Sequence, residues 1–283
     1  MRIAFFGTGL MGSGFVRRMR VCGHEVNVWN RSAAKARALQ DVGATAFDDP
    51  AAALAGAERL HVSLADDASV DAVLEPLAAV IAPGTWIVDH TTMAVTPTAE
   101  RVARWRSRGR GFVHAPVFMG PANALEGSGL MLLSCPQAQH DALLPELQQM
   151  TGKVVHVGEA PERAAAFKLF GNLTLIGIIG VLGDVNRLAA AVGISTQDAF
   201  SLFEHFNPGQ TLPARAARIV SADVTRPSFE LAMARKDVRL MIEEARRGGF
   251  ELPVTAGVAA MFDAALSRGE GALDVVAAAR IAS

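Results

Sequence analysis

Three glycines near the start of the chain have the spacing of a phosphate-binding loop. Gly7, Gly9 and Gly12 form the pattern G-x-G-x-x-G directly after the apolar run at residues 2–6. The first glycine permits a tight turn, the second lets the backbone approach a pyrophosphate, and the third lets a helix lie close to the strand. The helix that follows presents free N–H groups and a positive dipole end to phosphate. The pattern predicts a dinucleotide site, with the expected contacts Gly7, Thr8, Gly9, Leu10, Met11 and Gly12.

A second group of residues bears on which dinucleotide is bound. Residues 23–29 read as a turn and a second strand, and the position after it would contact the adenosine ribose. An acid there would accept from the ribose 2′-OH and favour NAD. The chain instead has Asn30, Arg31 and Ser32, with Lys35 one turn later. A guanidinium in place of an acid favours a 2′-phosphate, which predicts NADP. The alternative is a glycine-rich turn beside a solvated arginine.

A lysine and an asparagine later in the chain have the spacing for proton transfer. Lys168 and Asn172 are four residues apart, so on a helix they share one face. Their neighbours Phe167, Leu169 and Phe170 are apolar. Such surroundings disfavour the ammonium form and tune a lysine toward general acid–base work, while an asparagine amide orients a substrate oxygen. The alternative is a lysine that extends to solvent from a helix near a domain boundary.

The elements that must position these groups alternate along the first half of the chain. Strands are expected at residues 2–6, 23–29, 59–64, 85–89, 111–117, 130–134 and 154–157, and helices at 13–21, 68–81 and 94–108. This alternation predicts an α/β fold with a mainly parallel, doubly wound sheet of the Rossmann type. Ligands bind such sheets at the carboxyl ends of the strands. The first domain is therefore expected to span residues 1–160.

The second half of the chain has a different residue pattern. Strand signals vanish after Pro161, and alanine-rich helical sequence follows, beginning with one long helix expected at residues 162–192. An all-α domain is therefore expected at residues 161–283, joined through that helix. Residues 169–183 lack charge but number only 15 and carry four glycines, so a buried helix is expected rather than a membrane span.

Composition limits the partners. The net charge of −1 gives no general attraction to nucleic acid or to an anionic membrane, and we expect neither partner. Cys22 and Cys135 are far apart, which suits a reducing, cytoplasmic location, and no signal peptide is expected. The seven histidines show no metal-ligand spacing, so no metal site is predicted. One basic run is expected to be a solvated helix end, with a phosphate-binding face as the alternative; it comprises Arg101, Arg104, Arg106, Arg108 and Arg110.

Motifs along nearly the whole chain carry a resemblance. They are the Gly7–Gly12 loop, Ser63-Leu64-Ala65-Asp66, Asp89-His90-Thr91-Thr92, Ala115-Pro116-Val117, Lys168 with Asn172, and Phe229 followed by Lys236-Asp237. Together they resemble the β-hydroxyacid dehydrogenase family, which includes 3-hydroxyisobutyrate dehydrogenases and semialdehyde reductases. The resemblance implies a Rossmann domain, a long helix, and a helical domain that dimerises, with the active site in the cleft between them. A homodimer or homotetramer is expected.

The family's roles carry over by position. Lys168 resembles the catalytic lysine, which protonates a carbonyl oxygen as NADPH delivers hydride, and Asn172 orients the lysine or the substrate. Thr92 is implied beside nicotinamide and substrate, and Leu64 and Ala65 beside the cofactor. Lys236 is implied to approach the cofactor from the helical domain. An ion pair of the adjacent Asp237 with Arg235 or Arg239 on the helix surface is the alternative for that acid.

One departure from the family pattern concerns the substrate. Many relatives have Ser-Gly-Gly after Ala-Pro-Val, where serine and glycine amides hold a carboxylate; this chain has Phe118, Met119 and Gly120. Backbone N–H groups at Met119 and Gly120, with the Asn123 side chain, are the remaining candidate donors. The pocket is expected to be less polar than in relatives. The alternative is that Phe118 and Met119 turn inward as core.

The predicted activity is an NADP-dependent reductase or dehydrogenase acting on CH–OH groups, with a small aldehyde or keto acid as substrate. An imine reductase on the same fold is one alternative; the lysine argues against it, and the apolar Phe118–Met119 pair keeps it open. A non-catalytic NADP-binding module is the other. His90 and His114 fall near strand ends, where they either contact substrate or are structural.

Overall fold

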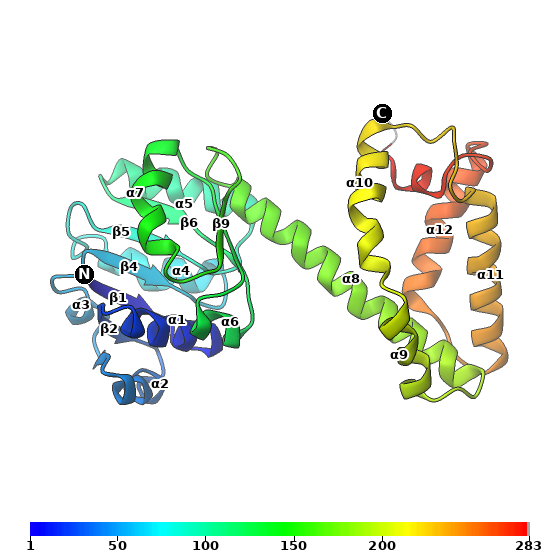
Figure 1. Cartoon of the computed structure of the whole chain (residues 1–283). Coiled ribbons are helices and arrows are strands. Elements are labelled where there is room, and N and C mark those ends of the chain that lie inside the picture. The colour runs from blue at the N-terminus through cyan, green and yellow to red at the C-terminus, as the bar shows by residue number, and fades with distance from the viewer. Residues whose placement is uncertain (282–283) are drawn as a thin grey trace. The chain divides into compact units, whose positions relative to one another are not determined.

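The computed structural model describes residues 1–281, which form two compact units. The first is Met1–Leu173 and the second begins at Thr174 (Figure 1). The division lies inside helix α8 (Arg163–Ala191), later than the boundary expected after residue 160. Each unit is described by itself.

The first unit is built on a six-stranded parallel sheet. Its strands are β1 (Arg2–Phe6), β2 (Glu25–Trp29), β3 (Thr45–Phe47), β4 (Arg59–Val62), β5 (Trp86–Asp89) and β6 (Gly111–His114). The order is β3-β2-β1-β4-β5-β6. The chain starts in the middle of the sheet and winds outward in both directions, which confirms the doubly wound Rossmann arrangement. The short strand β3 was not expected from the sequence.

Helices cover both faces of this sheet (Figure 1). They are α1 (Leu10–Val21), α2 (Ala33–Arg37), α3 (Pro50–Ala53), α4 (Asp67–Leu74), α5 (Val95–Ser107), α6 (Pro121–Glu126) and α7 (Gln137–Leu147). Alternate residues of β1 point to opposite faces. Phe5 accordingly joins one buried cluster with Phe15 of α1, and Phe6 joins the other with Trp105 of α5.

A separate three-stranded sheet follows, made of β7 (Val117–Phe118), β8 (Leu130–Leu133) and β9 (Lys153–His156). The single strand expected at residues 111–117 is wrong, because the chain leaves the large sheet at Ala115-Pro116. Proline has no N–H to continue a ladder. The helix expected at 68–81 is also shorter, ending in a 3₁₀ turn at Glu75–Leu77 that contains Pro76.

The second unit is helical throughout its described part, as expected. After α8 come α9 (Thr196–His205), α10 (Leu212–Ser221), α11 (Leu231–Arg247) and α12 (Pro253–Ser267), with 3₁₀ turns at Pro208–Thr211 and Val275–Ala279. Helices α11 and α12 lie side by side (Figure 1), and Leu231 and Val238 pack with Phe262 between them. The buried Asp274 closes this unit by accepting from Ser228 N–H at 2.7 Å.

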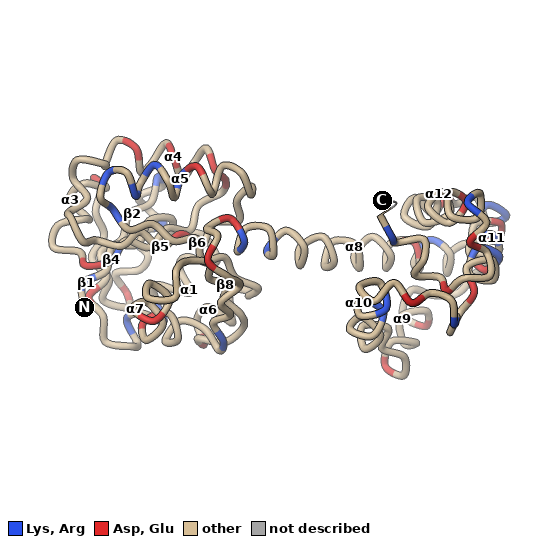
Figure 2. Tube along the Cα trace, turned by 90° about the horizontal axis from the view of Figure 1, so that it is seen from above, with Lys and Arg blue, Asp and Glu red and all other residues tan. Residues whose placement is uncertain are grey.

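Helix α8 has a long uncharged stretch. Between Lys168 and Asp184 it has no charged residue, so that part of its tube is tan in Figure 2. The expectation of a buried helix is wrong for this chain: Leu173 is 74% exposed and Ile179 69%. By length and composition α8 is apolar enough to cross a membrane, which by itself is weak evidence of a span.

Candidate functional site

The predicted site residues of the first unit gather where the parallel strands end. Backbone hydrogen bonds continue the ladder one residue past each strand: Ser63 N donates to Phe6 O at 2.9 Å, and Ala115 N to Asp89 O at 2.7 Å. The loops after β1, β4, β5 and β6 therefore leave the sheet along one edge. This edge is where doubly wound sheets bind ligands.

The glycine loop has the shape that a pyrophosphate requires. A Cβ on Gly7 would lie 2.1 Å from Ser63 O, and one on Gly12 would lie 1.9 Å from Gly7 O. These two positions admit only glycine because loop and helix are closely packed. A Cβ on Gly9 would meet nothing within 4 Å, so its backbone faces open space. Gly9 also begins α1 without a side-chain cap, which leaves the helix N–H groups available to an anion.

That open space belongs to a cavity of about 800 Å³. Its lining includes most of the predicted cofactor contacts, namely Gly7, Gly9, Leu10, Met11, Gly12, Asn30, Arg31, Ser32, Lys35, Leu64 and Ala65. Thr8 is buried beneath the loop, 4% exposed, and its Oγ1 has no hydrogen-bond partner among residues 1–281. The volume suits an elongated cofactor. The residues present therefore fit a dinucleotide, whose pyrophosphate the loop would hold.

Asn30 lines the cavity and also holds two loops together. Its Oδ1 accepts from Thr8 N–H at 3.0 Å, and its Nδ2 donates to Ser32 O at 3.0 Å. Asn30 thus joins the glycine loop to the loop after β2. Arg31 and Lys35 are exposed and line the cavity, and neither side chain pairs with another residue in the described part of the chain. Two free cations at this end suit a phosphate.

The opposite wall of the cavity comes from the loop after β4 and from α4. The sequence analysis assigned no cofactor contact to six residues that line it with Trp29, namely Ser63, Asp66, Ala68, Ser69, Ala72 and Val73. Asp66 caps α4 by accepting from Ser69 N–H at 2.8 Å, which lowers the pKa of its carboxyl. The spacing Asp-x-x-Ser at the start of a helix is a recognisable capping signal.

The loop after β5 is fixed from three sides. Thr91 Oγ1 accepts from Leu64 N–H at 3.0 Å, and Thr91 O accepts from His114 Nε2 at 2.8 Å. Thr91 N–H donates to Asp89 Oδ1 at 2.8 Å. Thr92 follows this anchored residue and is exposed, and it is not among the residues that line the cavity. His114 is fully buried, and burial lowers its pKa to about 4, so at neutral pH its imidazole is uncharged and structural.

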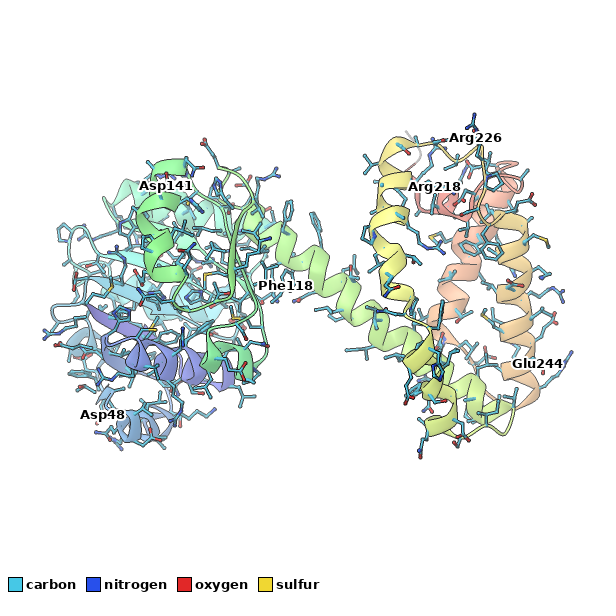
Figure 3. The ribbon with its side chains drawn as sticks, in the orientation of Figure 1. Asp48, Phe118, Asp141, Arg218, Arg226 and Glu244 are labelled. Atoms are coloured by element: carbon cyan, nitrogen blue, oxygen red, sulfur yellow. The ribbon has the colours of Figure 1, made fainter. Side chains whose placement is uncertain are left out.

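Lys168 lies in an aromatic and carbonyl environment. Its Nζ donates to Val117 O at 2.7 Å and lies 4.3 Å from the centroid of the Phe118 ring. The residue is 9% exposed, and burial lowers the pKa of its ammonium. Figure 3 shows Phe118 beside the first turns of α8, where Asn172 is half-buried one turn after Lys168. The lysine is therefore built into the site rather than extended into solvent.

Polar groups of the segment after Phe118 form hydrogen bonds with one another. Gly120 N–H donates to Asn123 Oδ1 at 2.9 Å, and Asn123 Nδ2 donates to Ser128 Oγ at 3.0 Å. Met119 packs against the cluster that contains Phe5 and Phe15, so for this residue the inward alternative holds. The anion donors expected at Gly120 and Asn123 already have partners.

A buried polar chain, which the sequence did not reveal, lies under the strand ends. His90 Nδ1 lies 2.7 Å from Ala115 O, and a carbonyl only accepts, so this nitrogen carries hydrogen. Burial lowers the pKa of His90 to about 3, so its Nε2 accepts from His61 Nδ1 at 3.0 Å. His61 Nε2 lies 2.6 Å from Glu146 Oε1.

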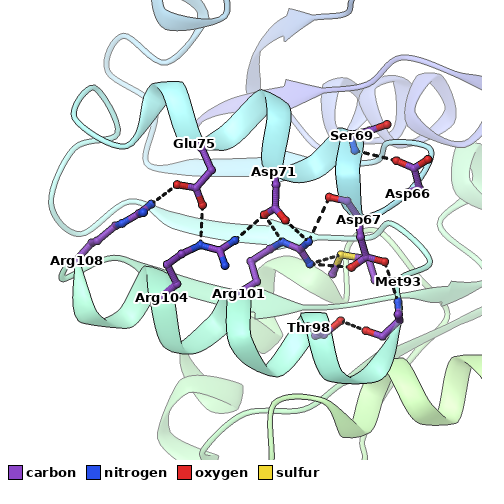
Figure 4. A network of polar contacts seen from close by, with 11 residues as sticks. Asp66, Asp67, Ser69, Asp71, Glu75, Met93, Thr98, Arg101, Arg104 and Arg108 are labelled. Atoms are coloured by element: carbon purple, nitrogen blue, oxygen red, sulfur yellow. Dashed lines mark hydrogen bonds and ion pairs between the residues drawn. The ribbon is translucent and has the colours of Figure 1, made fainter.

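The basic run on α5 is an ion-pair ladder. Arg101, Arg104 and Arg108 pair with carboxylates that α4 and the following turn contribute, Asp67, Asp71 and Glu75 (Figure 4). Arg101 is only 1% exposed, so the solvated helix end expected from the sequence is wrong for this residue. Asp71 Oδ1 accepts from Arg101 Nε at 2.7 Å. The ladder therefore fixes α4, a wall of the cavity, against α5.

Lys236 belongs to the second unit, on α11. Its Nζ lies 2.9 Å from Asp237 Oδ1, while Arg235 pairs with Asp263 and Arg239 with Glu243. Asp237 thus forms a surface ion pair, with a different partner from the two arginines considered from sequence. In the part of the chain that the structure describes, no group of three His, Cys, Asp or Glu residues is placed to hold a metal ion.

Known proteins match both halves of the chain. The family model described as the NAD binding domain of 6-phosphogluconate dehydrogenase matches residues 2–158. The model described as the NAD-binding domain of NADP-dependent 3-hydroxyisobutyrate dehydrogenase matches residues 163–282. An uncharacterised oxidoreductase of Bacillus subtilis, YfjR, is 26% identical over 282 residues, covering 97% of each chain. The 3-sulfolactaldehyde reductase of Escherichia coli is 24% identical over 277 residues, 96% of this chain and 92% of that one.

Solved structures confirm the fold. An imine reductase from Myxococcus stipitatus in complex with NADP+ superposes with a TM-score of 0.93 at 18% identity, covering 99% of each chain. At this identity the likeness concerns the fold alone. The family models together span nearly all of the chain, and the glycine loop, the cavity and the buried lysine fit their chemistry. The chain therefore belongs to the β-hydroxyacid dehydrogenase family and is an NAD(P)-dependent oxidoreductase.

Proposed function

We propose that the chain transfers hydride between NADPH and a small aldehyde or keto acid, and so interconverts carbonyl and CH–OH groups. The observation that carries the proposal is Lys168, whose ammonium is buried beside the loop that follows β6. A buried lysine with a lowered pKa is a suitable proton donor near neutral pH. The match to the 3-sulfolactaldehyde reductase of Escherichia coli supports an aldehyde as the reacting group.

The nicotinamide, when bound, supplies the hydride. Lys168 donates a proton to the carbonyl oxygen in the reducing direction and, as a neutral amine, accepts the hydroxyl proton in reverse. Asn172 shares its helix face and orients the substrate oxygen through its amide. Thr92, exposed after the anchored Thr91, borders the same reacting groups. Replacement of Lys168 by methionine should abolish turnover and leave cofactor binding intact; unchanged turnover would contradict the role.

We infer a preference for NADP from the two free cations of the cavity. Because Asn30 is committed to the loops, discrimination rests on Arg31, with Ser32 and Lys35. Arg31→Asp should weaken NADPH binding at least tenfold while NADH binding changes little, since only the 2′-phosphate is lost as a partner. Titration calorimetry with both cofactors measures this. The matched control is Arg37→Asp. It reverses the charge of an arginine that lies outside the cavity and pairs with Asp48.

Two other activities are separated by one experiment. Imine reduction is favoured by the Phe118 ring over Lys168 and by the shared fold with the imine reductase from Myxococcus stipitatus. Single-turnover NADPH oxidation with succinic semialdehyde, with glyoxylate and with a cyclic imine distinguishes them, and turnover of the imine alone would overturn carbonyl reduction. A non-catalytic NADP-binding module would bind cofactor equally with and without Lys168 and turn over none of the three.

We propose that a second copy of the chain covers the exposed face of α8. The support is the apolar surface of Leu173, Ile176 and Ile179, each more than 60% exposed. A two-fold pairing would place the same surface of each copy against the other, as homo-oligomers commonly do. Analytical ultracentrifugation should find a dimer or tetramer. A monomer that sediments alone at micromolar concentration would contradict this assembly.

A further inference from the structure

Phe118 is locked into a notch that one glycine creates. A Cβ on Gly171 would lie 2.2 Å from Phe118 Cζ and 2.5 Å from Cε1, so no other residue fits there unless the ring moves. Glycine inside a helix is unfavourable by about 1 kcal/mol relative to alanine, and here close contact with the ring accounts for it. The base of Phe118 packs against Leu132 and Ala164. The ring is therefore held on two sides.

The same ring faces the proton donor. Lys168 and Gly171 are three residues apart on α8 and share a face, so one ring contacts both. The Lys168 ammonium lies 4.3 Å from the ring centroid, within the range of a cation–π interaction. Its other partner is the Val117 carbonyl at 2.7 Å. Among the described residues no carboxylate forms an ion pair with Lys168, so a ring and a carbonyl alone hold the cation.

Two of the groups near this ring that could hold a substrate carboxylate are already engaged. Gly120 N–H is bonded to Asn123, and the Asn123 amide to Ser128. A carboxylate here would have to compete for these bonds or for the Lys168 ammonium that the reaction requires. An apolar substituent would compete for neither the bonds nor the ammonium. Burying a charge without partners costs far more than burying a methyl group gains.

We propose that Phe118 determines specificity at this site and selects carbonyl substrates whose remaining group is uncharged and apolar over those that carry a carboxylate. This inference rests on the proposed function, because it narrows the substrate class of the same lysine. Phe118 acts by placing an apolar ring beside the Lys168 ammonium and by being fixed there through Gly171. Two substrates that differ by one polar or apolar group at such a site are expected to differ by about tenfold or more in kcat/KM.

The test compares succinic semialdehyde with its methyl ester, which have the same aldehyde and differ in charge. The wild-type chain should prefer the ester at least tenfold in kcat/KM with NADPH. Phe118→Ser should reduce or reverse the preference, and Phe118→Leu, which keeps an apolar wall, should retain it. A wild-type preference for the acid, or an unchanged ratio in Phe118→Ser, overturns the specificity role. Turnover of neither substrate by any chain overturns the proposed function itself.

The notch is tested separately by a double substitution. Gly171→Ala should lower the unfolding temperature because its methyl overlaps the Phe118 ring. When Phe118 is already alanine, Gly171→Ala should lower the unfolding temperature much less, since the overlapping ring is gone, and the double variant should not show the preference for the ester. Simple addition of the two single losses in unfolding temperature would refute the coupling. This measurement needs no substrate and stands whatever the activity.

Discussion

Asp89 offers the sharpest quantitative test of the site's electrostatics. Its carboxyl is fully buried, and burial raises its pKa to about 7 despite the hydrogen bond from Thr91 N–H. Its Oδ2 has no hydrogen-bond partner within residues 1–281. The folded chain therefore binds a proton that the unfolded chain, with a pKa of 3.8, releases. The resulting stability is fully present below pH 3.8 and is lost as pH rises through 7.

The perturbation is Asp89→Asn, which keeps the acceptor for Thr91 and does not titrate. Between pH 5 and pH 7 the wild type should lose up to about 1.4 kcal/mol per pH unit from this group, or about 2.3 kcal/mol in total, because the slope halves at the folded pKa. The variant loses none of this. Burial lowers the pKa of His90 and of His114, which acts in the opposite direction, but both are present in both chains and cancel in the difference.

Urea unfolding followed by tryptophan fluorescence measures the difference. The chain's three tryptophans, Trp29, Trp86 and Trp105, all lie in the first unit, so the signal reports on that unit alone. The free energy of unfolding of the variant minus that of the wild type should rise by about 2–3 kcal/mol from pH 5 to pH 8. A difference that is flat or falls would refute the assignment of a buried protonated carboxyl. Asp41→Asn, whose side chain is 55% exposed, controls for loss of a surface charge.

Three further outcomes follow from the first unit. Gly9→Ala should fold normally yet bind NADPH at least tenfold more weakly, because its methyl enters the open cradle; Gly12→Ala should unfold at a lower temperature, because its methyl overlaps a carbonyl oxygen. Glu146→Leu should destabilise by about 3–5 kcal/mol in urea unfolding, because it leaves the Arg59 and His61 partners unpaired, whereas Glu146→Gln should lose less. Cys22 should react with a thiol reagent in the folded chain, and Cys135 only after unfolding. The reason is that Cys135 is 2% exposed and that burial raises the pKa of its thiol to about 11. Labelling of both cysteines at the same rate in the folded chain would contradict this.

Local sequence was sufficient for the fold and for the cofactor loop. The glycine spacing and the strand–helix alternation predicted the order of elements, because each rests on backbone requirements that a few neighbouring residues reveal. Short elements could not be predicted in this way. Strand β3 has only three residues, and the break at Pro116 depends on which sheet the chain joins next. Tertiary pairing, rather than local propensity, decides such positions.

Residues that act through distant partners could not be predicted. His61 and Glu146 are 85 positions apart, and nothing near either residue signals their contact. The bonds of the Asn30 amide to Thr8 N–H and Ser32 O likewise could not be predicted from the sequence. Lys168 was placed correctly on an apolar helix face, but its pairing with the Phe118 ring needed the fold. In general, the spacing of residues in the sequence predicts which side chains share a face of one helix or strand. Contacts between side chains of different elements follow only from the three-dimensional structure.

The ladder between α4 and α5 has a consequence for how these helices align. Asp67, Asp71 and Glu75 repeat every four residues, about 6 Å along a helix, so a slip of one turn would bring carboxylates opposite arginines again. Exposed ion pairs contribute too little to reject such a slip. Arg101 does reject it, because its guanidinium is only 1% exposed and bonds both carboxylate oxygens of Asp71, which a shift of one turn would replace with the longer Glu75 or with Asp67. This one buried arginine therefore distinguishes the observed alignment of α4 and α5 from one shifted by a turn, and so fixes the position of the cavity wall.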